Sequence, residues 1–282
     1  MSDPGGCTLC AGPRLSPPVL SSRWSSDAGQ GPTTSDVVVD DDAHGLYLVA
    51  RGLGPEPDRT QAVQAAAAAA VTLVLRSIAL DPRAPLDVLA RLAVEDANSV
   101  TWRRRAHMSP DVRVVLTLLL VRNGQVAVGH VGHARLLRIA GGQPIPLTVE
   151  HTVLGEHQRL GYPRPVGPPR LTRSLGESMF VDVDVSVHPL ELGASYVLLS
   201  SGFERVDASD ELTPVVCGFE PARVPAKLIE LARERGEHER LSALVVEPAS
   251  LEAQPSEAPL GPPSRSRPDR VPPQRGVIRG LP

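Results

Sequence analysis

Residues 45–54 read GLYLVARGLG, an apolar run with glycine on both sides. This pattern predicts a short strand over residues 46–50, because apolar and aromatic residues between turn-forming residues are typical of strands. A second run of this kind, Val37–Val39, comes shortly before it. The charged residue Arg51 therefore stands directly at the end of a predicted strand.

Two helices are predicted after this strand. The first lies between Pro57 and Asp81 and contains the six consecutive alanines 65–70. Alanine has the highest helix propensity, and its small side chain allows a helix to lie close to a sheet. The second runs from about Pro85 to Arg105, and its apolar residues recur near helical spacing, at Leu86, Leu89, Leu92, Ala93 and Ala97.

The remainder of the central region is rich in predicted strands. Asn123-Gly124 indicates a hairpin between the first two strands, and Gly132-His133 is interpreted as the next connection in a run of hairpins. One helix is predicted near 225–235. This order favours a layered sandwich of helices and largely antiparallel sheets over a parallel βαβ fold. The predicted strands are 112–121, 125–131, 134–139, 145–147, 181–187, 196–200 and 241–246.

Composition divides the chain into three parts. Residues 1–22 are rich in Pro, Gly and Ser and predict a flexible arm. Residues 23–247 form the predicted domain. Residues 248–282 combine many prolines with scattered arginines, which predicts a disordered tail in extended states.

The cysteines are few, at positions 7, 10 and 217. An odd, low number predicts reduced thiols in a cytoplasmic protein and not a disulfide scaffold. Cys7 and Cys10 have C-x-x-C spacing, but no further ligands for a structural zinc ion lie near them. We interpret this pair as two thiols in a flexible segment.

Charge gives no case for a nucleic-acid or membrane partner. The formal net charge of the 282 residues is −3, and no block of like charge stands out. The first 20 residues lack the basic start and apolar run of a signal peptide. The longest apolar stretch, Ala62 to Leu75, is too short to span a bilayer.

Eight short motifs are spread along the central region. They are SDAG at 26–29, TSD at 34–36, GLYLVARGLG at 45–54, HVGHAR at 130–135, LTVEHT at 147–152, LTRSLG at 171–176, LSSGF at 199–203 and ERLSALVV at 239–246. Over about residues 26–246 the chain thereby resembles the metal-dependent protein phosphatases, the PPM or type 2C family, in which such motifs occur in the same order. The resemblance implies an α+β fold, a four-layer α-β-β-α sandwich with two mostly antiparallel sheets between helices. It also implies hydrolysis of phosphoserine and phosphothreonine by two Mg²⁺ or Mn²⁺ ions that share a bridging water.

The resemblance also shows what this sequence has lost. Four family aspartates that bind the metals correspond here to Asp36, Arg51, Ser201 and Glu239. Arginine cannot lose its proton in a protein, and a serine hydroxyl is a poor ligand for Mg²⁺. Only Asp36 and, with a longer side chain, Glu239 remain as metal ligands if any metal binds.

Two accessory positions also depart from the family pattern. His133 replaces the aspartate of the family's H-V-G-D-S-R motif. The family usually has an arginine before its first aspartate to hold the substrate phosphate, but no Arg or Lys lies between Arg23 and Arg51. The losses therefore gather at one cleft.

Two hypotheses follow for Arg51. In the first, it pairs with Asp36 or Glu239 and fills the vacated metal site. In the second, Arg51, together with His133, forms a cationic pocket that binds a phosphorylated ligand.

The resemblance predicts a catalytically inactive pseudophosphatase with no catalytic residue and no metal cofactor. It would act in bacterial phosphosignalling and bind a protein such as a Ser/Thr kinase or a phosphoprotein regulator. The main alternative is a divergent but active phosphatase that uses Asp36, Glu239, Asp40 or Asp41 to hold Mg²⁺ or Mn²⁺. In a third hypothesis the domain is a rigid scaffold, and the Pro/Arg tail carries the interaction.

Overall fold

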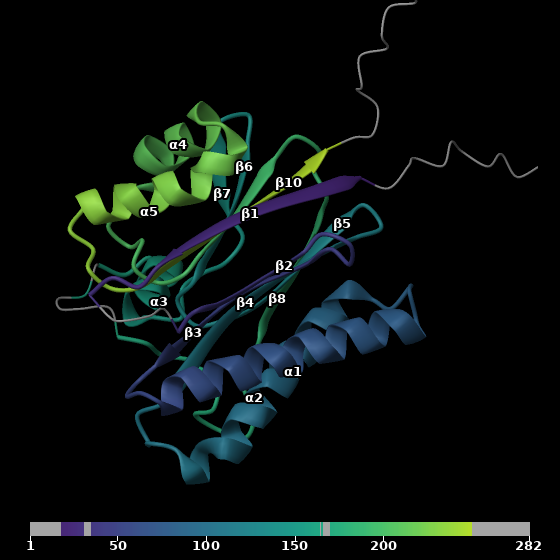
Figure 1. Ribbon diagram of the computed structural model, residues 1–282, viewed down its shortest axis with the longest axis vertical. Helices are drawn as coiled ribbons and strands as arrows, with labels where there is room; N and C mark the ends of the chain where they lie inside the picture. The colour runs from purple at the N-terminus through teal and green to yellow at the C-terminus, as the bar shows by residue number, and fades with distance from the viewer. Residues whose placement is uncertain (1–17, 31–34, 164, 166–169, 250–282) are drawn as a thin grey trace, which may run out of the picture. The chain divides into compact units, whose positions relative to one another are not determined.

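The protein is an α+β sandwich in which two five-stranded sheets lie between outer helices (Figure 1). The structure, a computed structural model, describes residues 18–30, 35–163, 165 and 170–249. The fold class predicted from the sequence is therefore confirmed. Cys7, Cys10, most of the predicted arm and nearly all of the predicted tail lie outside the described residues.

The first sheet has the strand order β2-β3-β4-β5-β8, and every neighbouring pair is antiparallel. Helices α1 (Asp58–Leu80) and α2 (Leu86–Arg104) cover its outer face (Figure 1). Both helices lie within two residues of their predicted bounds. The strands are β2 (Val37–Asp41), β3 (Leu46–Leu53), β4 (Arg113–Arg122), β5 (Gln125–Val131) and β8 (Asp184–Pro189).

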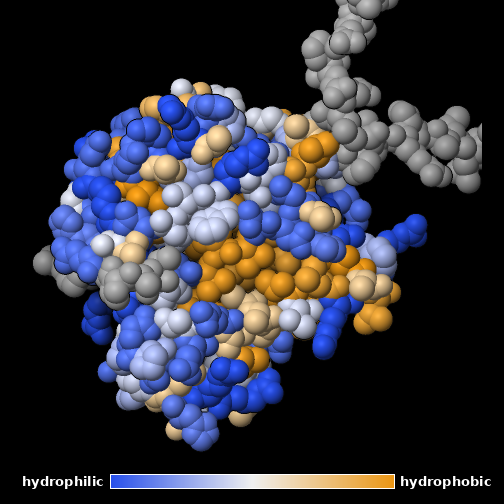
Figure 2. Space-filling model, viewed as in Figure 1, coloured by the Kyte–Doolittle hydropathy of each residue, from blue (hydrophilic) through white to orange (hydrophobic). Residues whose placement is uncertain are grey.

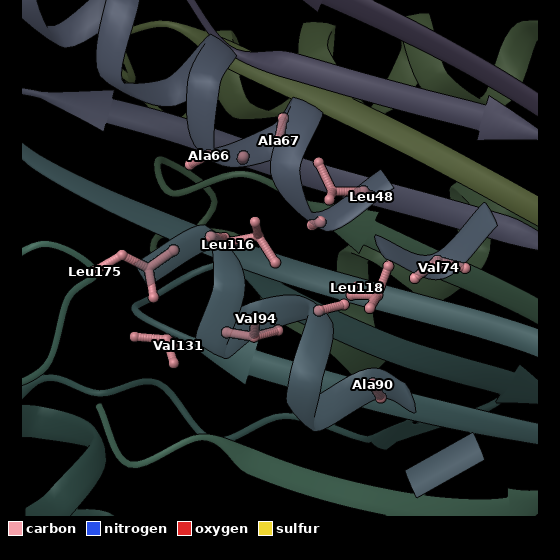
Figure 3. Packing of buried hydrophobic residues seen from close by; sticks show 14 of the residues in the cluster. Leu48, Ala66, Ala67, Val74, Ala90, Val94, Leu116, Leu118, Val131 and Leu175 are labelled. Carbon is pink, nitrogen blue, oxygen red and sulfur yellow. The ribbon is translucent and has the colours of Figure 1, made fainter. Parts of the chain in front are cut away.

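Small side chains let the helices lie close to this sheet. The buried face of α1 carries Ala62, Ala66, Ala67 and Ala70, and a methyl group added at Gly129 of β5 would lie 3.0 Å from a carbonyl oxygen of α2. Figure 3 shows Leu48 of β3 and Leu116 and Leu118 of β4 beneath the two helices. The alanine run therefore sets the spacing of the helix layer.

The second sheet has the order β1-β10-β9-β6-β7, again antiparallel throughout. Helix α5 (Val224–Glu234) covers its outer face, beside α4 (Thr213–Gly218) (Figure 1). Helix α3 (Val153–Leu160) follows β7, and its first turn is capped by the Thr152 hydroxyl. The strands of this second sheet are β1 (Val19–Asp27), β6 (Arg135–Ala140), β7 (Gln143–Pro146), β9 (Ser195–Leu199) and β10 (Leu241–Ala249).

Three short helical turns complete the described elements. They are the 3-10 turns at Arg105–His107 and Pro221–Arg223 and the π-helical turn at Ala208–Leu212.

Strand alternation decides which side chains meet between the sheets. Leu46, Leu48 and Ala50 of β3 face the helices, whereas Tyr47 and Val49 lie in the core between the sheets. Successive residues of a strand point to opposite faces, so Arg51 follows Tyr47 and Val49 into the space between the sheets. An arginine at this position is directed inward.

One connection differs from the predicted run of hairpins. β5 and β6 lie in different sheets, so Gly132-His133 is a crossover between the layers and not a hairpin turn. Gly132 has a positive φ of 119°, and a Cβ there would lie 2.3 Å from the Cβ of Val115. The turn at Gly193 likewise joins β8 and β9 of different sheets. Turn-forming residues indicate a reversal of the chain but not which sheet receives the next strand.

Several elements were not predicted from the sequence. β1 begins at Val19, inside the predicted flexible arm, and β10 ends two residues beyond the predicted domain end at residue 247. β1 reads VLSSRWSSD and lacks apolar alternation. It forms because all nine of its residues pair with β10, a tertiary partner that local sequence does not reveal. Helices α3 and α4 are too short for a periodic pattern.

Two apolar features of the surface remain. The apolar stretch Ala62 to Leu75 is part of the longer helix α1, which, contrary to the expectation from the sequence, is long and apolar enough to span a membrane by length and composition alone. No other helix in the described part of the chain meets these criteria, and one face of α1 packs on α2 and the first sheet. Figure 2 shows a hydrophobic band on the side where β1 and β2 lie in Figure 1. Both are edge strands, so core residues such as Leu20 and Val38 stay partly exposed there.

Candidate functional site

Arg51 lies at the centre of a polar cluster between the two sheets. Its side chain comes from β3 of the first sheet, and only 5% of the residue is exposed. Ser200 and Ser201 follow β9 of the second sheet, and Arg240 precedes β10. A buried guanidinium needs partners for all of its N–H groups, because an unpaired buried charge is costly.

Asp36 is the principal partner of Arg51. Nε of Arg51 donates to Oδ1 of Asp36 at 3.0 Å, and Nη2 donates to Oδ2 at 3.0 Å. The Asp36 side chain, directly before β2, is 0% exposed. The hydroxyl of Ser242 on β10 also donates to Oδ2, at 3.0 Å. This is a two-pronged arginine–carboxylate pair, the arrangement that fits the planar guanidinium best.

The remaining guanidinium N–H groups of Arg51 bind the second sheet. Nη1 donates to the carbonyl oxygen of Ser201 at 2.8 Å and to its hydroxyl at 2.6 Å. Nη2 donates to the Ser200 hydroxyl at 3.3 Å and to the carbonyl oxygen of Arg240. Each guanidinium nitrogen therefore has acceptors within the protein. This leaves Arg51 no free donor for a phosphate group, so the geometry does not favour the cationic-pocket hypothesis.

A second cation, Arg240, lies beside Arg51. It is buried and donates through Nη2 to the carbonyl oxygen of Gly52 at 3.2 Å, while its Nε has no hydrogen-bond partner among the described residues. Burial lowers the pKa of the Arg240 guanidinium, and the nearby Arg59 and Arg51 lower it further. Sequence reasoning missed this residue. The signal for a second arginine lay in the ERLSALVV motif. Arg240 stands there at the position of the asparagine in the family's D-N-I-T-V-V-V-V motif.

Glu239 does not join the cluster. The residue is exposed, and within the described ranges no hydrogen bond or ion pair links its carboxylate to Arg51. Its backbone carbonyl oxygen accepts a hydrogen bond from Arg233 at 2.7 Å. Of the two partners that the sequence suggested for Arg51, the structure therefore places only Asp36 in contact.

His133 lies close to Arg51 but is not a cation. Burial lowers the pKa of its imidazole to about 4, and the charge of Arg51 lowers it as well. Its Nδ1 is buried without a hydrogen-bond partner in the part of the chain that the structure describes. His133 is therefore neutral at pH 7 and adds no positive charge for a phosphorylated ligand.

A carboxylate pair borders the crossover that carries His133. Burial raises the pKa of the Glu150 carboxyl to about 7, and the nearby Glu204 contributes to this rise. The positive charge of Arg135 partly offsets it by lowering the pKa. Nε of Arg135 lies 3.9 Å from Oε1 of Glu150, and Nη1 of Arg135 donates to the carbonyl oxygen of Phe203 at 2.9 Å. Glu150 is thus held where ionisation is unfavourable.

A further cluster joins three of the motifs noted in the sequence. Nδ1 of His151 accepts a hydrogen bond from the Gly132 amide at 3.0 Å, and its Nε2 lies 3.0 Å from Oδ2 of Asp184. Arg173 of the LTRSLG motif donates to Oδ1 of Asp184 at 2.5 Å. His130 is fully buried beside His151, with 4.7 Å between the ring centroids. These contacts connect HVGHAR, LTVEHT and LTRSLG around the crossover.

Solved structures have the same architecture. The structure is similar to the serine/threonine phosphatase PstP/Ppp of Mycobacterium tuberculosis, with a TM-score of 0.69 and 22% identity over 82% of this chain and 99% of that one. The chain has the PPM phosphatase fold. A PPM Ser-Thr phosphatase, MsPP from Mycobacterium smegmatis, solved with cacodylate, gives a TM-score of 0.68 and 25% identity over 81% of this chain and 98% of that one.

Another PstP structure holds two manganese ions, with a TM-score of 0.70 and 22% identity over 83% of this chain and 100% of that one. No protein-family model and no curated protein matches the sequence. The PPM fold is therefore established by structure, at sequence identities that leave the chemistry open.

The side chains at the centre of this PPM fold do not fit a pair of hard divalent cations. Mg²⁺ and Mn²⁺ prefer several carboxylate or carbonyl oxygens and water. Here the buried Asp36 carboxylate is bound to Arg51, and a second arginine lies beside it. Within the described residues, no group of three or more His, Cys, Asp or Glu side chains is arranged to hold a metal ion.

Asp40 and Asp41, the other ligands considered for an active enzyme, lie elsewhere on this PPM fold. Asp40 pairs in register with Tyr47 and Asp41 with Leu46, near the start of β3, whereas Arg51 lies near its end. Asp41 also binds His44, with 2.7 Å between Oδ2 and Nδ1. Neither carboxylate reaches the cluster around Arg51.

Proposed function

We propose that this chain is a catalytically inactive PPM-fold protein, a binding or regulatory module in bacterial phosphosignalling. One observation carries the proposal: the guanidinium of Arg51 fills the space between the sheets and binds Asp36 and the Ser200–Ser201 segment. These are two of the four segments where the family places its metal ligands. Arginine thus supplies a permanent cation in place of exchangeable ones.

Electrostatics supports the loss of metal binding. Relative to the family pattern, arginine at position 51 adds two units of positive charge and serine at position 201 adds one. A divalent ion at about 4 Å from the guanidinium would meet a repulsion of about 4 kcal/mol per unit charge at an effective dielectric constant of about 20. Arg240 adds to that repulsion.

Without the ions, a PPM fold has no means of activating water. A metal-bound water loses its proton near neutral pH, and this supplies the nucleophile. His133 is neutral at pH 7 but has no carboxylate partner among the contacts described for it, and a histidine alone provides no electrophile for the phosphate oxygens. The intact frame with its altered centre fits a protein that binds a partner, such as a Ser/Thr kinase or a phosphoprotein regulator.

The competing function is a divergent, active Mg²⁺- or Mn²⁺-dependent phosphatase. It would require Arg51 to leave Asp36 and to give up its contacts with Ser200, Ser201 and the Arg240 carbonyl group. No observation in the described structure favours such a movement, so we keep this function as the outcome that the experiment must exclude.

Calorimetric titration with Mn²⁺, joined to a phosphatase assay on p-nitrophenyl phosphate and phosphopeptides, tests the proposal. Wild type should bind no Mn²⁺ tightly and release no phosphate. The variant with Arg51→Asp, Ser201→Asp and Glu239→Asp should gain a Mn²⁺ site, because the carboxylate set is restored. Adding Asp36→Ala to this variant should remove the site again. Wild-type hydrolysis that stops when Asp36 alone is replaced would refute the proposal.

A further inference from the structure

Arginines and exposed apolar side chains gather near the C-terminal end of α2. Asn98 and Trp102, four residues apart, lie on one face of the last turns of α2, and Arg105 begins the 3-10 turn that follows. The segment after the LTRSLG motif crosses this face. We call the following set the arginine–aromatic surface: Trp102, Arg103, Arg105, Met179 and Phe180.

The crossing segment is fixed by hydrogen bonds. The buried Asn98 accepts from the Gly176 amide at 2.9 Å and donates to the carbonyl oxygens of Ser178 and Met179 at 3.2 and 3.0 Å. Arg105 donates to the carbonyl oxygen of Gly176 at 2.8 Å. A segment whose backbone is held at this many points presents its side chains in a defined place.

The side chains presented there are apolar and exposed. Phe180 is 83% exposed and Met179 is 58% exposed. Such a pair has no role in the core, since neither packs against the hydrophobic clusters of the described residues. Large apolar residues exposed together mark interaction sites, and Phe, Met, Trp and Arg are the residue types enriched in protein–protein interfaces.

The arginines beside them carry uncompensated charge. Within the described ranges, Arg103 and Arg105 donate to backbone carbonyl oxygens but form no ion pair with any acidic side chain. The Arg105 guanidinium lies 5.8 Å from the ring centroid of Trp102. A groove of about 530 Å³ is lined by Trp102, Arg103, Arg105 and Ala106. Two cations and an aromatic side chain suit a ligand that carries negative charge next to an apolar group.

We propose that the arginine–aromatic surface binds an acidic segment of a partner protein, in which Asp or Glu residues flank a large apolar side chain. The carboxylates lie against Arg103 and Arg105, and the apolar residue packs on Phe180, Met179 and Trp102. A peptide suits this surface better than a membrane or nucleic acid, because the basic area is short and the whole chain carries a net charge of −3. This inference rests on the binding role proposed above and names the chemistry of its partner.

The test uses the full chain and a fluorescent peptide in which glutamates flank a central pair of leucines. Fluorescence anisotropy should show saturable binding that weakens as salt is added. Phe180→Ala should weaken binding about tenfold, and Arg103→Glu should weaken it at least as much. A peptide with lysine in place of glutamate should not bind.

Matched control variants exist on α1. Leu80→Ala removes an apolar side chain that is 88% exposed, and Arg76→Glu reverses an exposed arginine. Leu80 and Arg76 lie near the C-terminal end of α1. The arginine–aromatic surface lies near the N-terminal end of α1, because Asp58 there accepts a hydrogen bond from the amide of Ser109, shortly after Arg105, at 2.7 Å. These controls should bind the peptide as wild type does, and all four variants should keep the wild-type thermal midpoint.

Two results would overturn this inference. One is equal peptide affinity in wild type and in the Phe180 and arginine variants. The other is stronger binding to single-stranded RNA or to phosphatidylserine vesicles than to the peptide, with no effect of Phe180→Ala. Either result leaves the Mn²⁺ and phosphatase measurements untouched, so failure here is distinguishable from failure of the proposed function.

Discussion

Arg51 and Asp36 meet through two parallel hydrogen bonds of 3.0 Å each, and the Asp36 side chain is completely buried. Arg51 lies on β3 of the first sheet and Asp36 directly precedes β2 of that sheet. The same guanidinium also binds Ser201 and Arg240, which lie at the ends of strands of the second sheet. The pair is therefore a structural joint as well as a substitute for cations. This double role makes the consequences of changing either residue predictable.

Arg51→Ala should destabilise the protein by about 3–5 kcal/mol, because it leaves the Asp36 carboxylate buried and without its cation. Urea denaturation followed by circular dichroism measures the free energy of unfolding. The pair Arg51→Met and Asp36→Leu should recover most of that loss, since an apolar pair of similar volume leaves no charge unpaired.

The control is Arg59→Ala, which removes a more exposed arginine paired with Glu56. This change should cost less than about 1 kcal/mol. If Arg51→Ala proved no more damaging than Arg59→Ala, the joint between the sheets would not be the stabilising element described above.

Acid should destabilise the protein through His133. Its folded pKa of about 4 lies below the ordinary value of 6.5, so the unfolded state binds more protons between these values. The free energy of unfolding should therefore fall as the pH is lowered from about 6.5 to about 4, by roughly 2–3 kcal/mol from this residue. In His133→Asn the fall should be smaller by that amount, as measured by denaturation at a series of pH values.

Glu150 should have the opposite effect of pH. Its folded pKa of about 7 lies above the ordinary 4.5, so the folded state holds the extra proton between these values. As the pH rises from about 4.5 to about 7, Glu150 progressively costs stability, and above that the cost stays constant. Glu150→Gln should thus be more stable than wild type at pH 8, by about 1–3 kcal/mol, and equal to it below pH 4.5. An identical difference at both pH values would contradict this assignment.

Asn98→Ala should loosen the segment that presents Met179 and Phe180. It removes the acceptor of the Gly176 amide and the donor to two carbonyl groups. The loss of these bonds at a buried site should cost about 1–3 kcal/mol. Hydrogen exchange should then accelerate at the Gly176 amide while the amides of β4 and β5 keep their protection; uniform acceleration would indicate global destabilisation instead.

The sequence predicted the elements whose pattern is local. Both long helices and the β4–β5 hairpin were found within a few residues, because alanine propensity, apolar spacing and Asn123-Gly124 act on neighbours in the chain. The crossover at Gly132 was misplaced, because the residues that pull β6 into the other sheet lie far away in sequence. β1 was missed for the same reason, since its partner β10 is more than 200 residues away.

The candidate site was predicted in identity but not in geometry. Motif order named Asp36, Arg51 and Ser201, and these three residues do meet. The sequence did not show that Glu239 turns to solvent while its neighbour Arg240 turns inward, because that depends on the strand face at the start of β10. The burial that keeps His133 neutral was also hidden, since neighbours from distant segments create it.

The joint at Arg51 also has a thermodynamic consequence. A domain whose site is filled by bound ions gains stability with the logarithm of the free ion concentration. Its free energy of unfolding therefore depends on how much metal is present. A guanidinium attached to β3 has no dissociation constant and cannot be removed by a chelator. We therefore expect this domain to keep one thermal midpoint in EDTA, in Mg²⁺ and in Mn²⁺, so that the shape offered to a partner is insensitive to the ionic state of its surroundings.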